Sequence, residues 1–272
     1  MSWTKKGMCC VLSLLMLFCM GTGRSQSLAA SYSDLVSDIL TSLSEIDNKC
    51  TSASQQAVNG AYRLTEMLAI IGHECASTTN QATMVSSILD DLSTINETCS
   101  GAPQQLANGA YRIVDMLALI ALERDTYTAY QKLILDIVDD RDTKNESCSG
   151  APQQAVNGLY RSVELLAIIA LEEDGKGNYK DLITGVLDDL STKNNSCSGA
   201  PQQQVNGAYR MVDMLTILAL ELDSTGVWRQ TILDVLDSLD TNNDHAESAA
   251  QQLVNGLYRC VELSAIVAME LG

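Results

Sequence analysis

The sequence is poor in aromatic residues, histidine and proline. Aromatic residues make up 4% of its 272 residues, with one phenylalanine, three prolines and two histidines. A core with so few rings depends on Leu, Ile, Val, Ala and Met, which favours helices. The two histidines, His73 and His245, leave little scope for histidine-dependent catalysis or a histidine-rich metal site. These shortages argue against most classes of enzyme.

Basic residues are also scarce. Seventeen Lys and Arg stand against 34 Asp and Glu, which gives a formal net charge of −17. A chain this acidic cannot displace counterions from a phosphate backbone, so we expect no nucleic-acid partner, and basic partners fit better. The hydrophobic fraction of 46% also excludes a disordered acidic chain.

The N-terminus has the pattern of a secretory signal peptide. Lys5 and Lys6 precede an apolar run over residues 9–20, and small residues follow up to Ser27. This run is too short to span a bilayer, which takes about 20 residues. We therefore predict a signal peptide over residues 1–27, a secreted, extracellular protein and no membrane span.

The rest of the chain is an internal repeat. The block at residues 58–63 recurs four times, always at an interval of 49 residues. Residues 28–272 divide without remainder into five repeats, at 28–76, 77–125, 126–174, 175–223 and 224–272. This self-similarity predicts one repeat domain over residues 28–272. The constant interval reflects either recent duplication or loops whose length is fixed by packing.

Each repeat contains two helical patterns. In the third repeat, the first runs from Tyr130 to about Asp139 with apolar residues at i, i+3 and i+4. The second starts near Pro152, which suits a first helical turn, and continues to Glu172. We predict an all-α fold of five tandem 49-residue helical hairpins, forming an α-solenoid or a closed helical array with the second helices inside.

A polar stripe recurs at the start of the second helix. In the first repeat it includes Asn59, Tyr62, Arg63 and Glu66, and Arg63 can pair with Glu66 at i, i+3. The stripe is interpreted either as hydrogen bonding between repeats or as a repeated surface for a ligand or partner. Its Asn and Arg positions are Asn59, Arg63, Asn108, Arg112, Asn157, Arg161, Asn206, Arg210, Asn255 and Arg259.

Glycine interrupts the same pattern at Gly60 and its four equivalents. Glycine inside a helix costs about 0.5–1 kcal/mol relative to alanine, which indicates a close backbone approach. The alternative is that Asn59-Gly60 forms a turn and the helix begins at Tyr62.

Six cysteines follow the predicted signal peptide and are candidates for disulfides in an oxidising compartment. They are Cys50, Cys75, Cys99, Cys148, Cys197 and Cys260. Four share one repeat position, where regularly stacked hairpins would hold them on the order of 10 Å apart, too far for a disulfide, which leaves pairing after local distortion or between molecules. Cys75 and Cys260 break the repeat pattern and are candidates for a bridge to a repeat cysteine or to another chain.

Three acceptor sequences for N-glycosylation occur in register, at Asn96, Asn145 and Asn194. We expect them in a surface loop ahead of the second helix.

Residues 240–244 begin like a calcium-binding loop, but His245 stands where that loop needs glycine. The sequence has no nucleophile elbow, metal-ligand spacing or phosphate loop, so we predict no enzyme activity, cofactor or metal.

The opening Met1-Ser2-Trp3-Thr4, followed by a short apolar core, resembles the signal peptides of spider silk-gland proteins. The rest of the chain shares the Ser, Ala, Gln and Gly content of those proteins, but it has no poly-Ala or Gly-rich silk repeat. The resemblance implies a secreted component of a matrix or fibre.

These features predict a non-enzymatic structural or interaction protein that self-associates, or binds protein partners, through repeated helical faces. One alternative is a carrier that holds an apolar small molecule between the inner helices. Another is a secreted effector whose acidic surface binds a basic partner.

Overall fold

The computed structural model describes residues 25–126 and 128–271, and these residues form ten helices and no strand, which confirms the all-α prediction. All but the last three residues of the predicted signal peptide lie outside the described residues. One set of helices is α2 (Ser25–Asp47), α4 (Thr79–Thr98), α6 (Gln131–Ser147), α8 (Lys180–Ser196) and α10 (Arg229–Asp244). The other set is α3 (Ala53–Cys75), α5 (Ala102–Arg124), α7 (Ala151–Glu173), α9 (Ala200–Leu222) and α11 (Ala249–Leu271).

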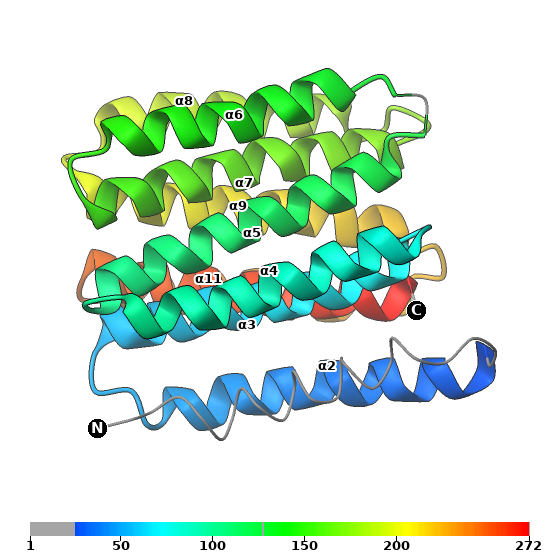
Figure 1. The fold of residues 1–272 in the computed structure, drawn as a ribbon, viewed down its shortest axis with the longest axis horizontal. Coiled ribbons are helices and arrows are strands. Elements are labelled where there is room, and N and C mark those ends of the chain that lie inside the picture. Colours follow the sequence, from blue (N-terminus) through cyan, green and yellow to red (C-terminus); the bar gives the residue numbers. More distant parts are fainter. Residues whose placement is uncertain (1–24, 127, 272) are drawn as a thin grey trace.

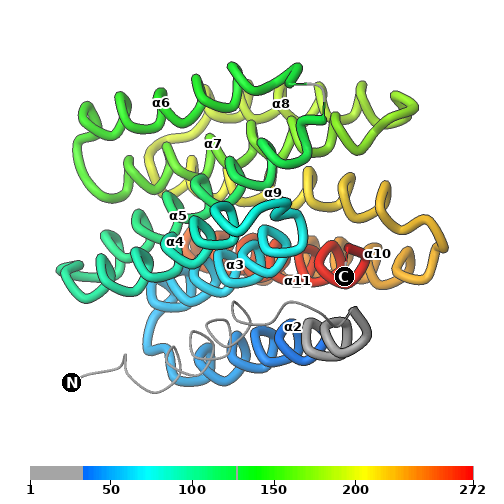
Figure 2. The backbone as a smooth tube through the Cα atoms, turned by 45° about the vertical axis from the view of Figure 1, so that its right-hand side comes forward, coloured from blue at the N-terminus to red at the C-terminus, as the bar shows by residue number. Residues whose placement is uncertain are grey.

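The second set forms the inner layer. Helix α3 packs on α5, α5 on α7, α7 on α9, α9 on α11, and α11 packs back on α3, so this series of contacts is closed (Figures 1 and 2). An outer helix connects each inner helix to the next, and the inner helices therefore run parallel to one another. The start of every inner helix lies at one end of the molecule, and the last turn of each lies at the other.

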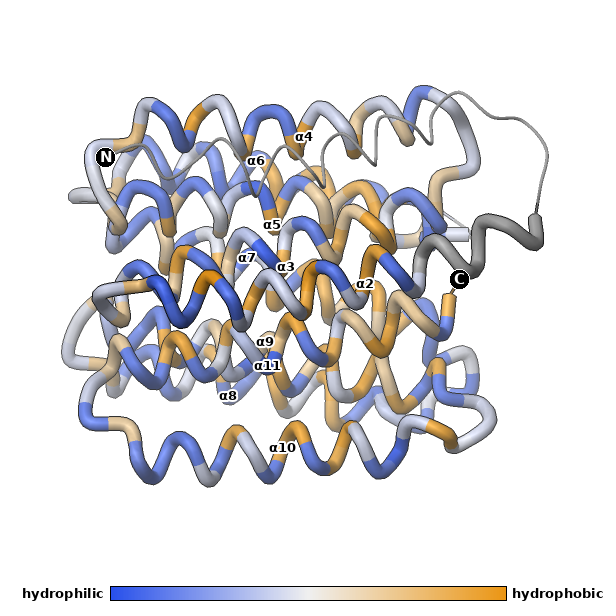
Figure 3. The backbone as a smooth tube through the Cα atoms, turned by 90° about the horizontal axis from the view of Figure 1, so that it is seen from below, coloured by the Kyte–Doolittle hydropathy of each residue, from blue (hydrophilic) through white to orange (hydrophobic). Residues whose placement is uncertain are grey.

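The first set forms the outer layer. Helix α4 packs on α3 and α5, and α2 packs on α3 and α11, so each of these outer helices covers a pair of inner helices. An outer helix buries only one stripe, which in α4 consists of Val85, Leu89, Leu92 and Asn96. Hydrophobic residues dominate where the C-terminal halves of the inner helices meet, and the opposite end is mixed (Figure 3).

The centre of the inner layer is packed solid. Positions 49 residues apart meet there, and one such set is buried on all five helices: Leu64, Ile113, Ser162, Met211 and Cys260. Nearer the C-terminal ends, leucines including Leu68 and Leu117 surround a cavity of only about 20 Å³. That space holds about one water molecule, so this leucine-lined cavity is not a channel.

Gly60 lies inside α3, so the alternative of a turn at Asn59-Gly60 is wrong. A Cβ atom at Gly60 would lie 3.0 Å from Leu257 Cβ and 3.0 Å from Tyr258 Cδ1 of α11. The close approach that the sequence indicated is therefore confirmed, and it occurs where α3 meets α11.

The outer helices are longer than predicted. Helix α6 continues to Ser147, whereas the sequence pattern indicated an end near Asp139. The glycosylation acceptors Asn96, Asn145 and Asn194 therefore lie in the last turns of outer helices, and their placement in a loop was wrong. The calcium-like segment at residues 240–244 is likewise helical, as the end of α10.

Candidate functional site

The asparagines of the polar stripe link each inner helix to its neighbours. Asn59 Nδ2 donates to the carbonyl oxygen of Leu43 at 3.0 Å and to the hydroxyl of Tyr258 at 3.2 Å. The other four donate in the same way to the carbonyl 16 residues earlier, over 2.8–3.1 Å. All five asparagines are buried. This half of the stripe therefore holds outer and inner helices together.

A tyrosine follows each of these asparagines, and its hydroxyl reaches the next outer helix. Tyr62 donates to Asn96 Oδ1 at 2.6 Å, and Tyr258 in α11 donates to Asp47 Oδ1 of α2 at 2.6 Å. The remaining three donate to Asn145, Asn194 and Asn243, over 2.7–2.8 Å. We call these five interactions the tyrosine latches. Burial raises the pKa of the five hydroxyls, so they stay protonated and remain donors.

The latches use the three asparagines of the glycosylation sequences. Asn96 is buried, and Asn145 and Asn194 are half-buried, each with its side-chain oxygen occupied by a tyrosine. Attachment of glycans at these sites remains a prediction, which must be reconciled with their position beneath a neighbouring tyrosine.

The arginines of the stripe form ion pairs within their own inner helices, and three of them also pair with an outer helix. All five pair with the acid three residues later, as predicted, in Arg63–Glu66 and its equivalents. Arg112, Arg161 and Arg210 also pair with an aspartate of the outer helix of their own repeat, over 2.8–3.1 Å. Ser238 stands at the equivalent position for Arg259. Among the described residues, Arg259 is left with Glu262 as its only acidic partner.

No disulfide joins any cysteine in the described part of the chain, so the disulfide candidates find no pairing. Cys260 is buried in the centre, with its sulfur 3.7 Å from the carbonyl oxygen of Ala208. Burial raises the pKa of the Cys75 thiol, against the opposing effect of nearby Arg124, which pairs with Glu173. The other four lie half-buried, within three residues of the ends of outer helices, with pKa values also raised by burial.

Three buried aspartates at the ends of inner helices, Asp125, Asp174 and Asp223, were not anticipated from the sequence. Asp174 follows α7, and its two carboxylate oxygens accept from the backbone N–H groups of Asn178 and Tyr179 at 2.7 and 2.8 Å. Asp125 accepts from the N–H of Tyr130 at 3.1 Å. These two carboxylates anchor the turns that lead into α8 and α6. Their recurrence 49 residues apart was the available signal.

Arg141 was also missed. It is buried in α6, pairs with Asp115 of α5, and lies 5.6 Å from the ring centre of Tyr111. The equivalent positions in the other repeats carry leucine, so the repeat pattern predicted an apolar residue here.

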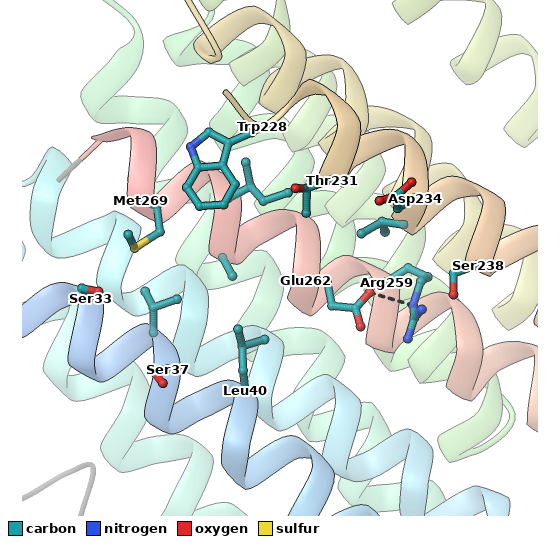
Figure 4. A pocket seen from close by; sticks show the side chains of 14 residues that line it. Ser33, Ser37, Leu40, Trp228, Thr231, Asp234, Ser238, Arg259, Glu262 and Met269 are labelled. Atoms are coloured by element: carbon teal, nitrogen blue, oxygen red, sulfur yellow. Dashed lines mark ion pairs between the residues drawn. The ribbon is translucent and has the colours of Figure 1, made fainter. Parts of the chain in front are cut away.

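Two grooves of about 500 Å³ lie between outer helices. One, of about 530 Å³, is formed by α2, α10 and α11, and it contains Trp228, Met269 and the Arg259–Glu262 pair (Figure 4). We call it the seam groove because it lies where the first and last helices of the described chain meet. The other, of about 510 Å³, lies over α7 and is lined by more polar residues, such as Gln153 and Asn194.

Other types of site find no support in the described residues. They contain no group of three or more His, Cys, Asp or Glu arranged to hold a metal ion. Of the helices described, none combines the length and the apolar character that crossing a membrane requires. Compared with protein-family models, with curated proteins and with solved structures, the chain gives no match.

Proposed function

We propose that this chain is a secreted, non-enzymatic structural or interaction protein of an extracellular matrix, fibre or secretion. We further propose that its architecture is a closed ring of five tandem helical hairpins, as the 49-residue interval and the contact of α11 with α3 support. The latch from Tyr258 to Asp47 supports the same architecture, because it repeats at the junction of α11 and α2 the bond made between successive repeats.

The observation that carries the proposed function is a repeated apolar surface. Met84, Leu133 and Leu182 occupy one repeat position on α4, α6 and α8, and they are 51%, 49% and 58% exposed. A single exposed leucine needs no explanation, but the same exposure at the same position on three helices presents a regular array of contact points. We infer that these helices bind other copies of the chain side by side.

The thiols are less suited to this role. Cys50 and its three equivalents are half-buried, and burial raises their pKa, which lowers the fraction of reactive thiolate at neutral pH. The proposed association therefore rests on apolar contact and needs no covalent bond. Transport of a small molecule within the inner layer has no support, because its central cavity of about 20 Å³ is too small.

Sedimentation velocity over a range of concentrations tests the proposal. We expect the unmodified chain to associate with increasing concentration, and the triple variant M84S/L133S/L182S to remain monomeric. A matched control changes exposed aspartates on the same helices, as D90N/D139N/D188N, and should still associate. A chain that stays monomeric throughout, or a triple variant that associates as before, would overturn the proposal.

A further inference from the structure

The seam groove differs from the equivalent surfaces of the other repeats because its outer helices carry small residues. Thr231 of α10 stands where the other four repeats have Leu35, Met84, Leu133 and Leu182. Ser37 of α2 stands where α6 and α10 have leucine, although α4 and α8 also carry small residues there, Ser86 and Thr184. Without these larger side chains, the apolar floor formed by Ala265 and Ile266 opens into a groove of about 530 Å³. That volume falls within the range of small-molecule sites.

The groove extends along α11, and its two ends differ chemically. Arg259 and Met269 line it ten residues apart on α11, which corresponds to about 15 Å along the helix axis. Figure 4 shows Trp228 and Met269 toward one end, and Arg259 with Ser238 toward the other. An extended apolar chain with one polar end matches both ends of the groove.

At the polar end of the groove, Arg259 has one acidic partner fewer than the arginines of the middle repeats. Each of Arg112, Arg161 and Arg210 contacts two carboxylates, one from its own helix and one from the outer helix. Arg259 contacts one, because its Nε pairs with Glu262 at 2.9 Å and Ser238 replaces the outer aspartate. Among the described residues, no second carboxylate pairs with Arg259. The other acid of the groove, Asp234, accepts from Gln230 at 2.9 Å.

We propose that the seam groove binds a free fatty acid, with its carboxylate on Arg259 in the place of the missing aspartate and its alkyl chain over Ala265 and Ile266. Arginine presents two parallel N–H donors that match a carboxylate. The site is independent of the apolar array on α4, α6 and α8, so it stands whether or not the chain self-associates.

Tryptophan fluorescence reports on this groove directly. The chain has two tryptophans, Trp3 and Trp228, so the full chain with Trp3→Phe has its only tryptophan in the groove. Titration with sodium dodecanoate, below its micelle concentration and at about 0.15 M salt, should give a saturable blue shift. Dodecan-1-ol and dodecylamine should bind at least tenfold more weakly, because neither offers a carboxylate.

Two substitutions locate the site, and one serves as control. Ser238→Asp restores the aspartate of the middle repeats, so it should weaken dodecanoate binding at least tenfold without harm to the fold. Ser238→Asn introduces a side chain of the same shape as aspartate but without its charge, so this variant should bind dodecanoate as tightly as the unmodified chain. Ser37→Leu, which copies α6 and α10, should narrow the groove and weaken all three ligands.

The proposal is overturned if dodecanoate causes no saturable shift, or if the alcohol and the amine bind as tightly as the acid. It is also overturned if Ser238→Asp and Ser37→Leu bind dodecanoate unchanged, because binding would then lie elsewhere.

Discussion

At the scale of single residues, glycine decides how closely the inner helices approach. A Cβ atom at Gly158 of α7 would lie 2.8 Å from Ala110 Cβ and 3.1 Å from the backbone carbon of Ala110 on α5. Backbone cannot move aside as a flexible side chain can, so each inner helix needs glycine at this repeat position. The sequence predicted this close approach from the energetic cost of glycine, but it did not identify the neighbour.

Gly158→Ala should destabilise the protein by about 1–3 kcal/mol, because the added methyl group overpacks the α5–α7 contact. Gly185 is the matched control, since it is also helical, in α8, but an added Cβ atom would meet nothing within 4 Å. Gly185→Ala should stabilise by about 0.5–1 kcal/mol. Chemical denaturation measures both, and equal effects in the two variants would contradict the argument.

The acids of the polar stripe give a second residue-scale prediction. Burial raises the pKa of Glu66, against the opposing effect of Arg63, and it raises those of Glu164, Asp213 and Glu262 as well. Such groups bind protons more readily in the folded than in the unfolded chain, so the free energy of unfolding should rise as pH falls from 7 to 5. Glu66→Gln should flatten this dependence.

Thermal melting at several pH values measures the slope. Glu45→Gln serves as control because Glu45 is exposed on α2, and it should leave the slope unchanged. A slope that is as steep in Glu66→Gln as in the unmodified chain would show that Glu66 does not contribute.

At the scale of helices, the inner helices were predicted to within one or two residues and the outer helices were not. An apolar period and a proline at the first turn mark an inner helix such as α7. The second half of α6, residues 140–147, is polar and contains residues with weak helix propensity, so no sequence signal extends the helix there. The bond from Tyr111 to Asn145 holds this segment, and it joins residues 34 positions apart. A local pattern cannot reveal such a contact.

The turns between inner and outer helices depend on the buried aspartates. Asp174→Ala should destabilise by about 1–3 kcal/mol, because the N–H groups of Asn178 and Tyr179 lose their acceptor. Asp188→Ala, on the exposed face of α8, should change stability by less than about 0.5 kcal/mol. Hydrogen exchange should also show faster opening at the start of α8 in the first variant alone. Equal stability of the two variants would contradict an anchoring role for Asp174.

At the scale of the whole molecule, the last helix, α11, packs against α3 and α2 near the start of the described chain. Because of these contacts, the fold does not depend on chain continuity between any one pair of neighbouring hairpins. The sequence predicted the repeats but left open whether the array closes, because closure depends on the rotation between successive hairpins. No residue pattern encodes that rotation directly. Asp47 was one available signal, since it replaces the asparagine found at the equivalent position of the other four repeats.

Circular permutation tests closure. Outer helices run opposite to inner ones, so the start of α2 lies at the same end as the end of α11. A permutant with residues 28 and 272 joined by a short Gly-Ser linker, and new termini in the exposed loop at Lys176, should melt within a few degrees of the original chain. A permutant that fails to fold while the original folds would contradict the closed contacts.

The closed series of inner contacts also limits how the number of repeats can change during evolution. Duplicated DNA tends to gain or lose whole units by misaligned recombination, and an open array of hairpins tolerates this by growing or shrinking at its ends. In the proposed ring each hairpin must turn by one fifth of a full circle, so a lost or added unit would leave Tyr258 without Asp47 and strain every other junction. The copy number is then held at five by geometry, although single hairpins remain free to diverge on their outer faces.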